Sequence, residues 1–258
     1  MTTLYTATDN VRLDTLTVAL QPIMDLRTGR VHGFEALLRG PDGCDIHPKA
    51  LLRRARREHW LPELEARAQG LALLAAERFL QDNEILFLNV DSHVPPLRSR
   101  YPHLALEIDE TSSTPQDLLR RLQKDHFSVY LDNYGEQHGN IESILSIRPR
   151  GLKLSGDLVR GIADDRRRFA IARSLIQVAR DLGMELIAKG IETGEDLCAA
   201  RRAGFTYGQG HYLSRPKLVP NRRRIAATAT LLRGAVIETV TSARHRTSPL
   251  PTPADETL

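Results

Sequence analysis

Four apolar runs in this sequence end in side chains that carry oxygen ligands. They lead directly into Glu35, Asn89, Glu107 and the neighbouring pair Asp132 and Asn133. Carboxylate and amide oxygens are the ligands that hard cations such as Mg²⁺ or Mn²⁺ prefer. One such residue is explained well enough as a strand cap beside solvent. Repetition at four run ends instead favours a shared site.

Other metal chemistry has little support in the sequence. The two cysteines, Cys44 and Cys198, are far apart and lack the paired spacing of thiolate sites, so no disulfide framework is expected and a reducing compartment fits. His138 and His211 each lack a partner at ligand spacing, and we interpret both as structural or exposed histidines.

The elements that must position these ligands alternate between strand and helix patterns. Apolar runs predict strands at 17–22, 31–38, 85–90, 104–108, 128–132, 151–154 and 185–188, and a weaker one near 205–213. Apolar residues at steps of three and four predict helices at 64–80, 115–122 and 169–182, with Thr114 as an N-cap and Gly183 as a C-cap. This α/β pattern predicts a closed barrel, whose site lies at the carboxyl ends of the strands. An open doubly wound sheet is the weaker alternative, because Gly-rich phosphate loops are absent.

The end of the chain differs in charge from the rest. Residues 214–258 hold eight Lys and Arg against three acids, an excess of +5, so residues 1–213 contribute −1 to the net charge of +4. A helix is predicted at 222–243, and the alternating prolines of 248–253 are typical of disorder. Such a tail could attract nucleic acid, but it lacks the interleaved aromatic residues that stack on bases, so we expect no nucleic-acid partner.

Length and composition fit one main domain. With 258 residues, 41% of them hydrophobic, the chain can bury a large core. We divide it into an N-terminal segment (1–16), a barrel domain (17–216), and a basic helix with a disordered tail (217–258). No signal-like start is present and no run approaches the ~20 apolar residues of a membrane span, so we expect a cytoplasmic protein without a membrane partner.

A family resemblance rests on motifs spread along residues 17–216. Gln21-Pro22-Ile23, followed by Phe-Glu-Ala-Leu-Leu-Arg at 34–39, resembles the opening of an EAL domain, which is named after the Glu-Ala-Leu triplet. The likeness continues in order through Phe87-Leu88-Asn89-Val90, Leu106-Glu107-Ile108-Asp109-Glu110, Asp132-Asn133-Tyr134-Gly135, Leu152-Lys153-Leu154, Gly190-Ile191-Glu192-Thr193 and Gln209-Gly210. The resemblance implies a modified TIM (β/α)8-type barrel with one antiparallel strand, in a family that linearises cyclic di-GMP with two divalent metals.

The resemblance also implies metal and catalytic roles for particular residues. Glu35, Asn89, Glu107 and Asp132 match the ligands of the first metal, and Lys153 matches the lysine near the attacking water. Glu35 and Lys153 are therefore the catalytic candidates.

Further matches concern the ligand and its surroundings. Gln21 and Arg39 match positions that contact the dinucleotide, and Gln209 matches a glutamine at the site. A guanidinium such as that of Arg39 can hold a phosphate with two donors. Glu110 and Glu192 match glutamates that support the loop after the fifth strand.

Three positions depart from the family pattern, and all three remove negative charge. Asn133 and Ser155 stand where the family has Asp, and Lys189 stands where it has Glu, so the mouth loses about four negative charges. Positions 133 and 189 match ligands of the second metal. The loop from Asn133 to Gly139 also departs, which puts in doubt its coupling of the metal site to a dimer interface.

These departures favour a degenerate EAL domain that binds cyclic di-GMP, or a partner protein, as a receptor, with hydrolysis lost or weak. Mg²⁺ or Mn²⁺ would occupy one site at most, or none, and we expect a homodimer as in many relatives. One alternative is a slow metal-dependent phosphodiesterase. Another is a regulator that acts through protein contacts without any ligand.

Overall fold

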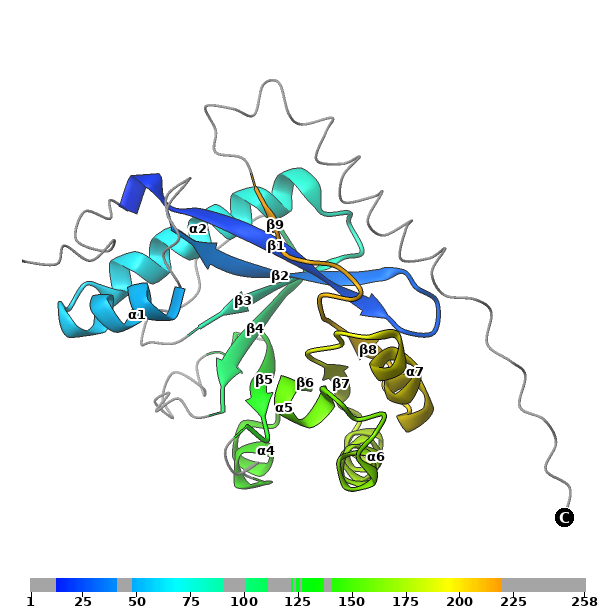
Figure 1. Cartoon of the computed structure of the whole chain (residues 1–258). Helices are drawn as coiled ribbons and strands as arrows, with labels where there is room; N and C mark the ends of the chain where they lie inside the picture. The colour runs from blue at the N-terminus through cyan, green and yellow to red at the C-terminus, as the bar shows by residue number, and fades with distance from the viewer. Residues whose placement is uncertain are drawn as a thin grey trace, which may run out of the picture.

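Eight strands close into a ring, which brings strand ends from the whole chain to one mouth (Figure 1). β1 (Thr17–Asp25) pairs antiparallel with β2 (Val31–Arg39) and with β8 (Tyr207–Gly208). From β2 to β8 the neighbours are parallel, in the order β2, β3 (Ile85–Asn89), β4 (Leu104–Asp109), β5 (Ser128–Tyr134), β6 (Gly151–Leu154), β7 (Glu185–Ala188) and β8. The predicted barrel with one antiparallel strand is confirmed.

The structure is a computed structural model that describes residues 13–40, 48–90, 101–110, 122, 124–125, 127–136 and 141–219. Several sequence predictions lie outside this range: the helix at 115–122 apart from Leu122, the helix at 222–243, the tail at 248–253, and the residues Cys44 and His138. Among the helices within it, none is long and apolar enough to cross a membrane.

The observed strands follow the predicted runs closely. β6 and β7 have the predicted bounds, β1 is three residues longer, and the weak candidate near 205–213 is the two-residue strand β8. Unexpectedly, β9 (Lys217–Leu218) pairs antiparallel with β1 at Ala19 and Leu20. Strand pairing therefore continues two residues past the expected end of the barrel at residue 216.

The helices lie outside the ring (Figure 1). They are α1 (Pro48–Arg57), α2 (Leu61–Phe79), α4 (Ile141–Ile147), α5 (Gly156–Val159), α6 (Arg166–Asp181) and α7 (Gly194–Ala203), preceded by a short 3-10 turn at Leu13–Thr15. α2 and α6 confirm two predicted helices. Asp165 is the N-cap of α6, and its carboxylate accepts hydrogen bonds from the backbone N–H groups of Arg167 and Arg168. Gly183 follows the end of the helix with a φ of +66°, a backbone conformation that favours glycine. Leu182, the last residue of the helix predicted at 169–182, lies just past the end of α6 and is exposed.

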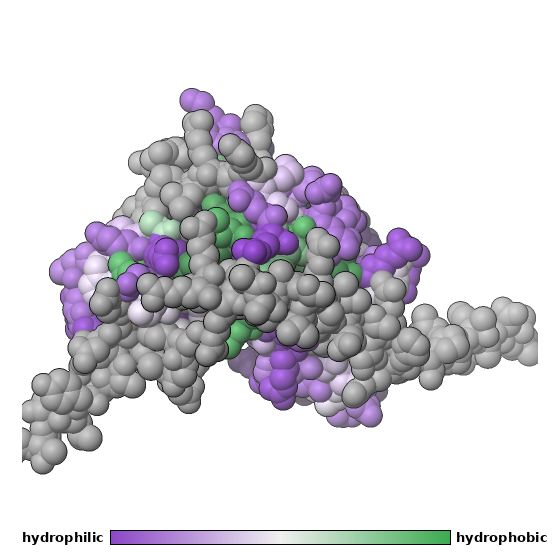
Figure 2. Space-filling view, turned by 90° about the horizontal axis from the view of Figure 1, so that it is seen from above, coloured by the Kyte–Doolittle hydropathy of each residue, from purple (hydrophilic) through white to green (hydrophobic). Residues whose placement is uncertain are grey.

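The side chains inside the ring form layers, and the layer nearest the mouth is polar. Ile23, Phe87, Ala105, Tyr130 and Ile187 form a buried apolar cluster. Side chains alternate along a strand, so the residue two positions further on faces the interior one layer higher. That residue is polar on each parallel strand: Asn89 after Phe87, Glu107 after Ala105, Asp132 after Tyr130, and Lys189 after Ile187. On the surface seen from above (Figure 2), hydrophilic residues prevail around the edge and hydrophobic ones show toward the centre.

An ion cluster around Glu185 lies at the amino end of β7, opposite the mouth. The Glu185 carboxylate accepts hydrogen bonds from the Tyr130 hydroxyl at 2.7 Å and Arg150 Nη2 at 2.8 Å, and lies 3.5 Å from His32 Nε2. Burial alone would raise the pKa of Glu185, but the nearby His32, the hydrogen bond from Tyr130 and the charge of Arg150 lower it to about 2. The ionised carboxylate therefore stabilises the fold.

We expect Glu185→Gln to lower the free energy of unfolding by about 2 kcal/mol near neutral pH. The folded-state pKa lies below the usual value of 4.5, so this stability is present above that value and is lost as pH falls through about 2. Urea unfolding of both proteins at about pH 7 and about pH 3 should show the difference shrinking. Asp82→Asn, on an exposed turn, is the control, and a difference independent of pH would contradict the ionic role.

Candidate functional site

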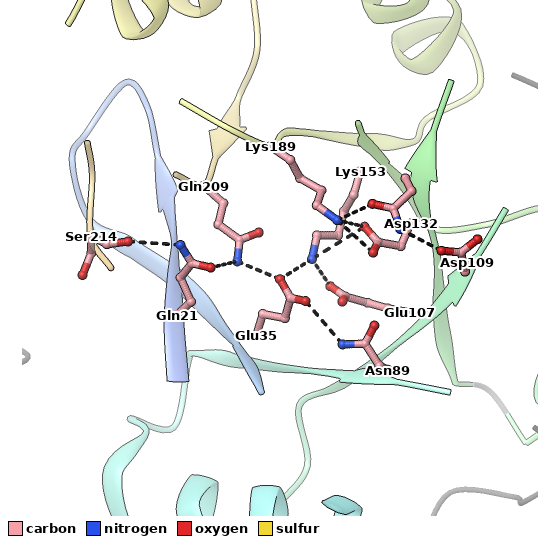
Figure 3. A network of polar contacts seen from close by, with 11 residues as sticks. Gln21, Glu35, Asn89, Glu107, Asp109, Asp132, Lys153, Lys189, Gln209 and Ser214 are labelled. Carbon is pink, nitrogen blue, oxygen red and sulfur yellow. Dashed lines mark hydrogen bonds and ion pairs between the residues drawn. The ribbon is translucent and has the colours of Figure 1, made fainter. Parts of the chain in front are cut away.

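The ammonium of Lys153 lies among three carboxylates at the barrel mouth (Figure 3). Its Nζ is 2.9 Å from Glu35 Oε2, 2.5 Å from Glu107 Oε1 and 4.0 Å from Asp132 Oδ1. The side chain is fully buried, with Nζ 5.9 Å from the centre of the Phe87 ring. The lysine comes from β6 and the acids come from β2, β4 and β5, so only the closed ring assembles this group.

A second lysine, Lys189, occupies the neighbouring position. Its Nζ lies 2.7 and 2.9 Å from the two oxygens of Asp132 and 2.7 Å from Asn133 Oδ1. The register of β5 and β6 shifts between Leu131 and Tyr134, and Asn133 has a φ of +55°, a conformation that asparagine tolerates better than most residues. This irregularity lets two successive side chains reach the same lysine.

The amide of Asn133 is oriented by Asp109. Asn133 Nδ2 donates to Asp109 Oδ2 at 2.7 Å, which leaves Oδ1 to face Lys189. An aspartate at position 133 would have no proton to donate and would set two carboxylates side by side. The amide at 133 and the lysine at 189 therefore form one matched pair.

A row of amides extends from the acids to β1. Gln209 Nε2 donates to Glu35 Oε2 at 2.7 Å and to Gln21 Oε1 at 3.1 Å, and Gln21 Nε2 donates to the carbonyl of Ser214 at 3.1 Å. Asn89 Nδ2 donates to Glu35 Oε1 at 3.3 Å. Gln21 and Glu35 are also partners in the β1–β2 register, so this row is fixed by backbone pairing.

The charges of the cluster do not cancel. Burial alone would raise the pKa of Glu35, but Lys153 and Lys189 hold it well below its usual range. Burial raises the pKa of Glu107, and the nearby carboxylate of Glu35 raises it further. Burial alone would lower the pKa of Lys153, but Glu107, Glu35 and Asp132 raise it, so the lysine stays charged.

This balance fits one hard cation better than two. Three carboxylates face two ammonium groups, and the buried Oε2 of Glu107 has no hydrogen-bond partner. That orphaned oxygen suits a single divalent ion held by Glu35, Asn89 and Glu107. In the described part of the chain, however, no three His, Cys, Asp or Glu side chains are grouped to hold a metal, because Lys153 lies between the acids. A cation would have to displace its ammonium. The donors do not fit a second ion, because Lys189 binds both oxygens of Asp132.

A cavity of about 1080 Å³ opens above the cluster. Glu35, Asn89, Glu107, Asp132 and Lys189 line its floor, and Arg39 at the end of β2 lines its wall. The Nη1 of Arg39 donates to the carbonyl of Leu38 at 2.8 Å. The cavity is therefore large enough for a nucleotide-sized ligand above a charged floor.

The structure brings together most of the residues named from the sequence. Glu110 accepts a hydrogen bond from the backbone N–H of Gly135 at 3.0 Å, while Glu192 lies apart, 3.2 Å from Arg160. Ser155 is buried before α5 and is not among the cavity-lining residues, and His211 is exposed.

Five residues that contact the site or line its cavity had no role predicted from the sequence: Asp109, Ser214, Lys49, Arg53 and Arg56. The strand period could have revealed Asp109, because it follows Glu107 by two residues.

Comparison with known proteins adds the family context. A family model described as EAL domain matches residues 5–216. The chain is 23% identical over 221 residues to the cyclic di-GMP phosphodiesterase PdeB of Shewanella oneidensis, covering 76% of this chain and 26% of that protein. It is 26% identical over 230 residues to the cyclic di-GMP phosphodiesterase NbdA of Pseudomonas aeruginosa, covering 80% and 29%. It thus spans well under half the length of these curated relatives.

Solved structures with the same fold contain cyclic di-GMP. BlrP1 of Klebsiella pneumoniae, in complex with manganese and cyclic di-GMP, superposes with a TM-score of 0.70 at 25% identity, covering 79% of this chain and 56% of that one. A standalone EAL protein of Vibrio cholerae, in its cyclic di-GMP-bound form, has a TM-score of 0.66 at 21% identity, covering 78% and 92%. The second likeness concerns the fold alone.

Proposed function

Because the chain belongs to the EAL domain family, we propose that it is a receptor that binds cyclic di-GMP in the cavity at the barrel mouth and hydrolyses it weakly or not at all. One observation carries this proposal: the ammonium of Lys189 is bonded to both oxygens of Asp132 and to the amide oxygen of Asn133. By the family resemblance, this positive charge stands at a position that matches a ligand of the second metal.

The cost to two-metal hydrolysis is large. In such reactions one cation generates the attacking hydroxide and both stabilise the charge that develops on the phosphate. At about 4 Å and an effective dielectric constant near 20, like charges repel by on the order of 4 kcal/mol. Half of this already lowers metal occupancy more than tenfold, because about 1.4 kcal/mol is a factor of ten.

Binding depends on features that these substitutions leave in place. Cyclic di-GMP carries two phosphate charges, and a less acidic mouth repels such a dianion less. Arg39 lines the cavity and offers a planar fork of donors suited to a phosphate. Gln21 lies buried beside Gln209 at the edge of the same cluster. We therefore expect the chain to retain binding of cyclic di-GMP even though its hydrolysis is weak or lost.

Calorimetric titration with cyclic di-GMP, with chromatography of the ligand afterwards, tests the proposal. We expect saturable binding and little or no linear product, with Mg²⁺ or with a chelator. No binding at high micromolar ligand would overturn it and leave regulation through protein contacts. The unpaired Oε2 of Glu107 and the buried Lys153 keep a slow phosphodiesterase as the second candidate. Linear product that requires Mn²⁺ and disappears in Glu35→Ala would favour that enzyme.

Arg39→Ala should weaken the binding of cyclic di-GMP by about 10- to 100-fold. A hydrogen bond to a charged group contributes roughly 1.5–3 kcal/mol, and each ~1.4 kcal/mol is tenfold. The same titration measures the change, and Arg27→Ala, on the exposed turn between β1 and β2, is the matched control. Equal affinity of the Arg39 variant and the wild type would remove Arg39 from the ligand site.

A further inference from the structure

One wall of the cavity is formed by a basic face of α1. Lys49, Arg53 and Arg56 all line the cavity. They are spaced by four and then three residues, so they lie on one side of the helix. The face is therefore a continuous positively charged strip beside the proposed ligand site.

The other side of α1 fixes this strip in place. Leu51 and Ala55 are fully buried and pack with Leu16 and Leu64 in a small separate hydrophobic cluster. Because the apolar face is anchored in this way, α1 cannot turn its charged face outward without exposing that cluster. The basic side chains of α1 therefore stay on the side of the helix that lines the cavity.

The arginines of α1 differ in what they contact. Arg54 and Arg57 lie 2.9 Å and 3.3 Å from the carboxylate of Glu58, and neither lines the cavity. Arg53 makes no hydrogen bond or ion pair with any other residue of the described ranges, and its side chain is exposed to the cavity. It is therefore available to bind an anion.

The floor offers no comparable group. The ammonium of Lys153 is held by Glu35 and Glu107, and that of Lys189 is held by Asp132 and Asn133. A negative charge added to the ligand is consequently accommodated best at Arg53. Phosphodiester groups carry one charge each, whereas a terminal phosphomonoester carries about −1.5 to −2.

We propose that Lys49, Arg53 and Arg56 form a subsite for a terminal phosphomonoester, so that the cavity prefers a linear dinucleotide with a 5′-phosphate over the same dinucleotide without one. The inference rests on the proposed function, because it assumes that a dinucleotide occupies this cavity. It adds a preference that the cyclic ligand cannot express.

The experiment compares three ligands by titration: cyclic di-GMP, linear diguanylate with a 5′-phosphate, and linear diguanylate without it. We expect the 5′-phosphate to tighten binding roughly tenfold at low salt, and less at high salt. Arg53→Gln and the double variant Arg53→Gln with Arg56→Gln should lose most of this ratio. Arg57→Gln, on the same helix but off the cavity, should keep it. Thermal unfolding verifies that all variants are folded.

The outcomes separate the two proposals. If cyclic di-GMP binds but the 5′-phosphate adds nothing, or its effect survives in both Arg53 variants, the subsite is wrong and the proposed function stands. If the phosphorylated linear ligand binds through Arg53 and cyclic di-GMP does not, the subsite stands and the proposed function falls. Binding of none of the three overturns both.

Discussion

Replacing Asn133 with Asp and Lys189 with Glu together should produce hydrolysis of cyclic di-GMP in the presence of Mn²⁺ or Mg²⁺. The change at 189 turns a positive charge into a negative one beside Asp132, which frees both of its oxygens for a cation. At on the order of 4 kcal/mol for each charge, halved for relaxation, the three units of negative charge added by the double change improve metal occupancy by about ten-thousandfold. Linear product, followed by chromatography against the wild type, measures the gain.

Both substitutions are needed because the two side chains form one unit. Asn133 donates to Asp109 and accepts from Lys189, so Asn133→Asp alone places a carboxylate against Asp109 while the lysine remains. Lys189→Met removes the ammonium without adding a ligand and is the matched control. Product formed equally by Lys189→Met and the double variant would argue against a metal-binding gain. If the double variant is folded and binds the dinucleotide but forms no product, the assignment of positions 133 and 189 to a decayed metal site is wrong.

Lys153→Met should destabilise the fold more than any other change at the mouth. It keeps the side-chain length but leaves the carboxylates of Glu35 and Glu107 buried without their shared ammonium. Removing one partner from a buried ion pair costs about 3–5 kcal/mol. At about 2–4 °C for each kcal/mol, the midpoint of thermal unfolding should fall by roughly 10 °C. The deficit should shrink as pH falls, because the carboxylates then take up protons in the folded state.

A second substitution and a metal ion distinguish charge from packing. Lys153→Met with Glu107→Gln removes the uncompensated charge and should recover much of the loss. If one cation can replace the ammonium, Mn²⁺ should raise the unfolding midpoint of Lys153→Met more than that of the wild type. A Lys153→Met protein as stable as the wild type would mean that the lysine does not lie among the acids. A double variant no more stable than the single one would place the cost in packing instead.

Local sequence pattern was enough to predict the ring and the composition of its mouth. Strand runs showed where the chain is extended and predicted that Glu35 and Glu107 stand where those runs end, at the carboxyl ends of the strands. Lys153 was named only by the motif resemblance. The motif resemblance singled out Lys189 and Asn133 as departures. Their predicted consequence for hydrolysis remains a proposal.

Only the tertiary structure decided which charge meets which. Lys153 and Glu35 are 118 positions apart, and their contact depends on closing the ring, which no local pattern describes. The same holds for the amide of Asn133 oriented by Asp109, for the unpaired oxygen of Glu107, and for the basic face of α1 turned toward the cavity. No helix was predicted from the sequence at α1. Its position on the cavity wall follows from the packing of Leu51 and Ala55 against Leu16 and Leu64. Contacts between residues far apart in the sequence set the orientation of a helix, whereas the periodicity of its apolar residues gives only the width of its apolar face.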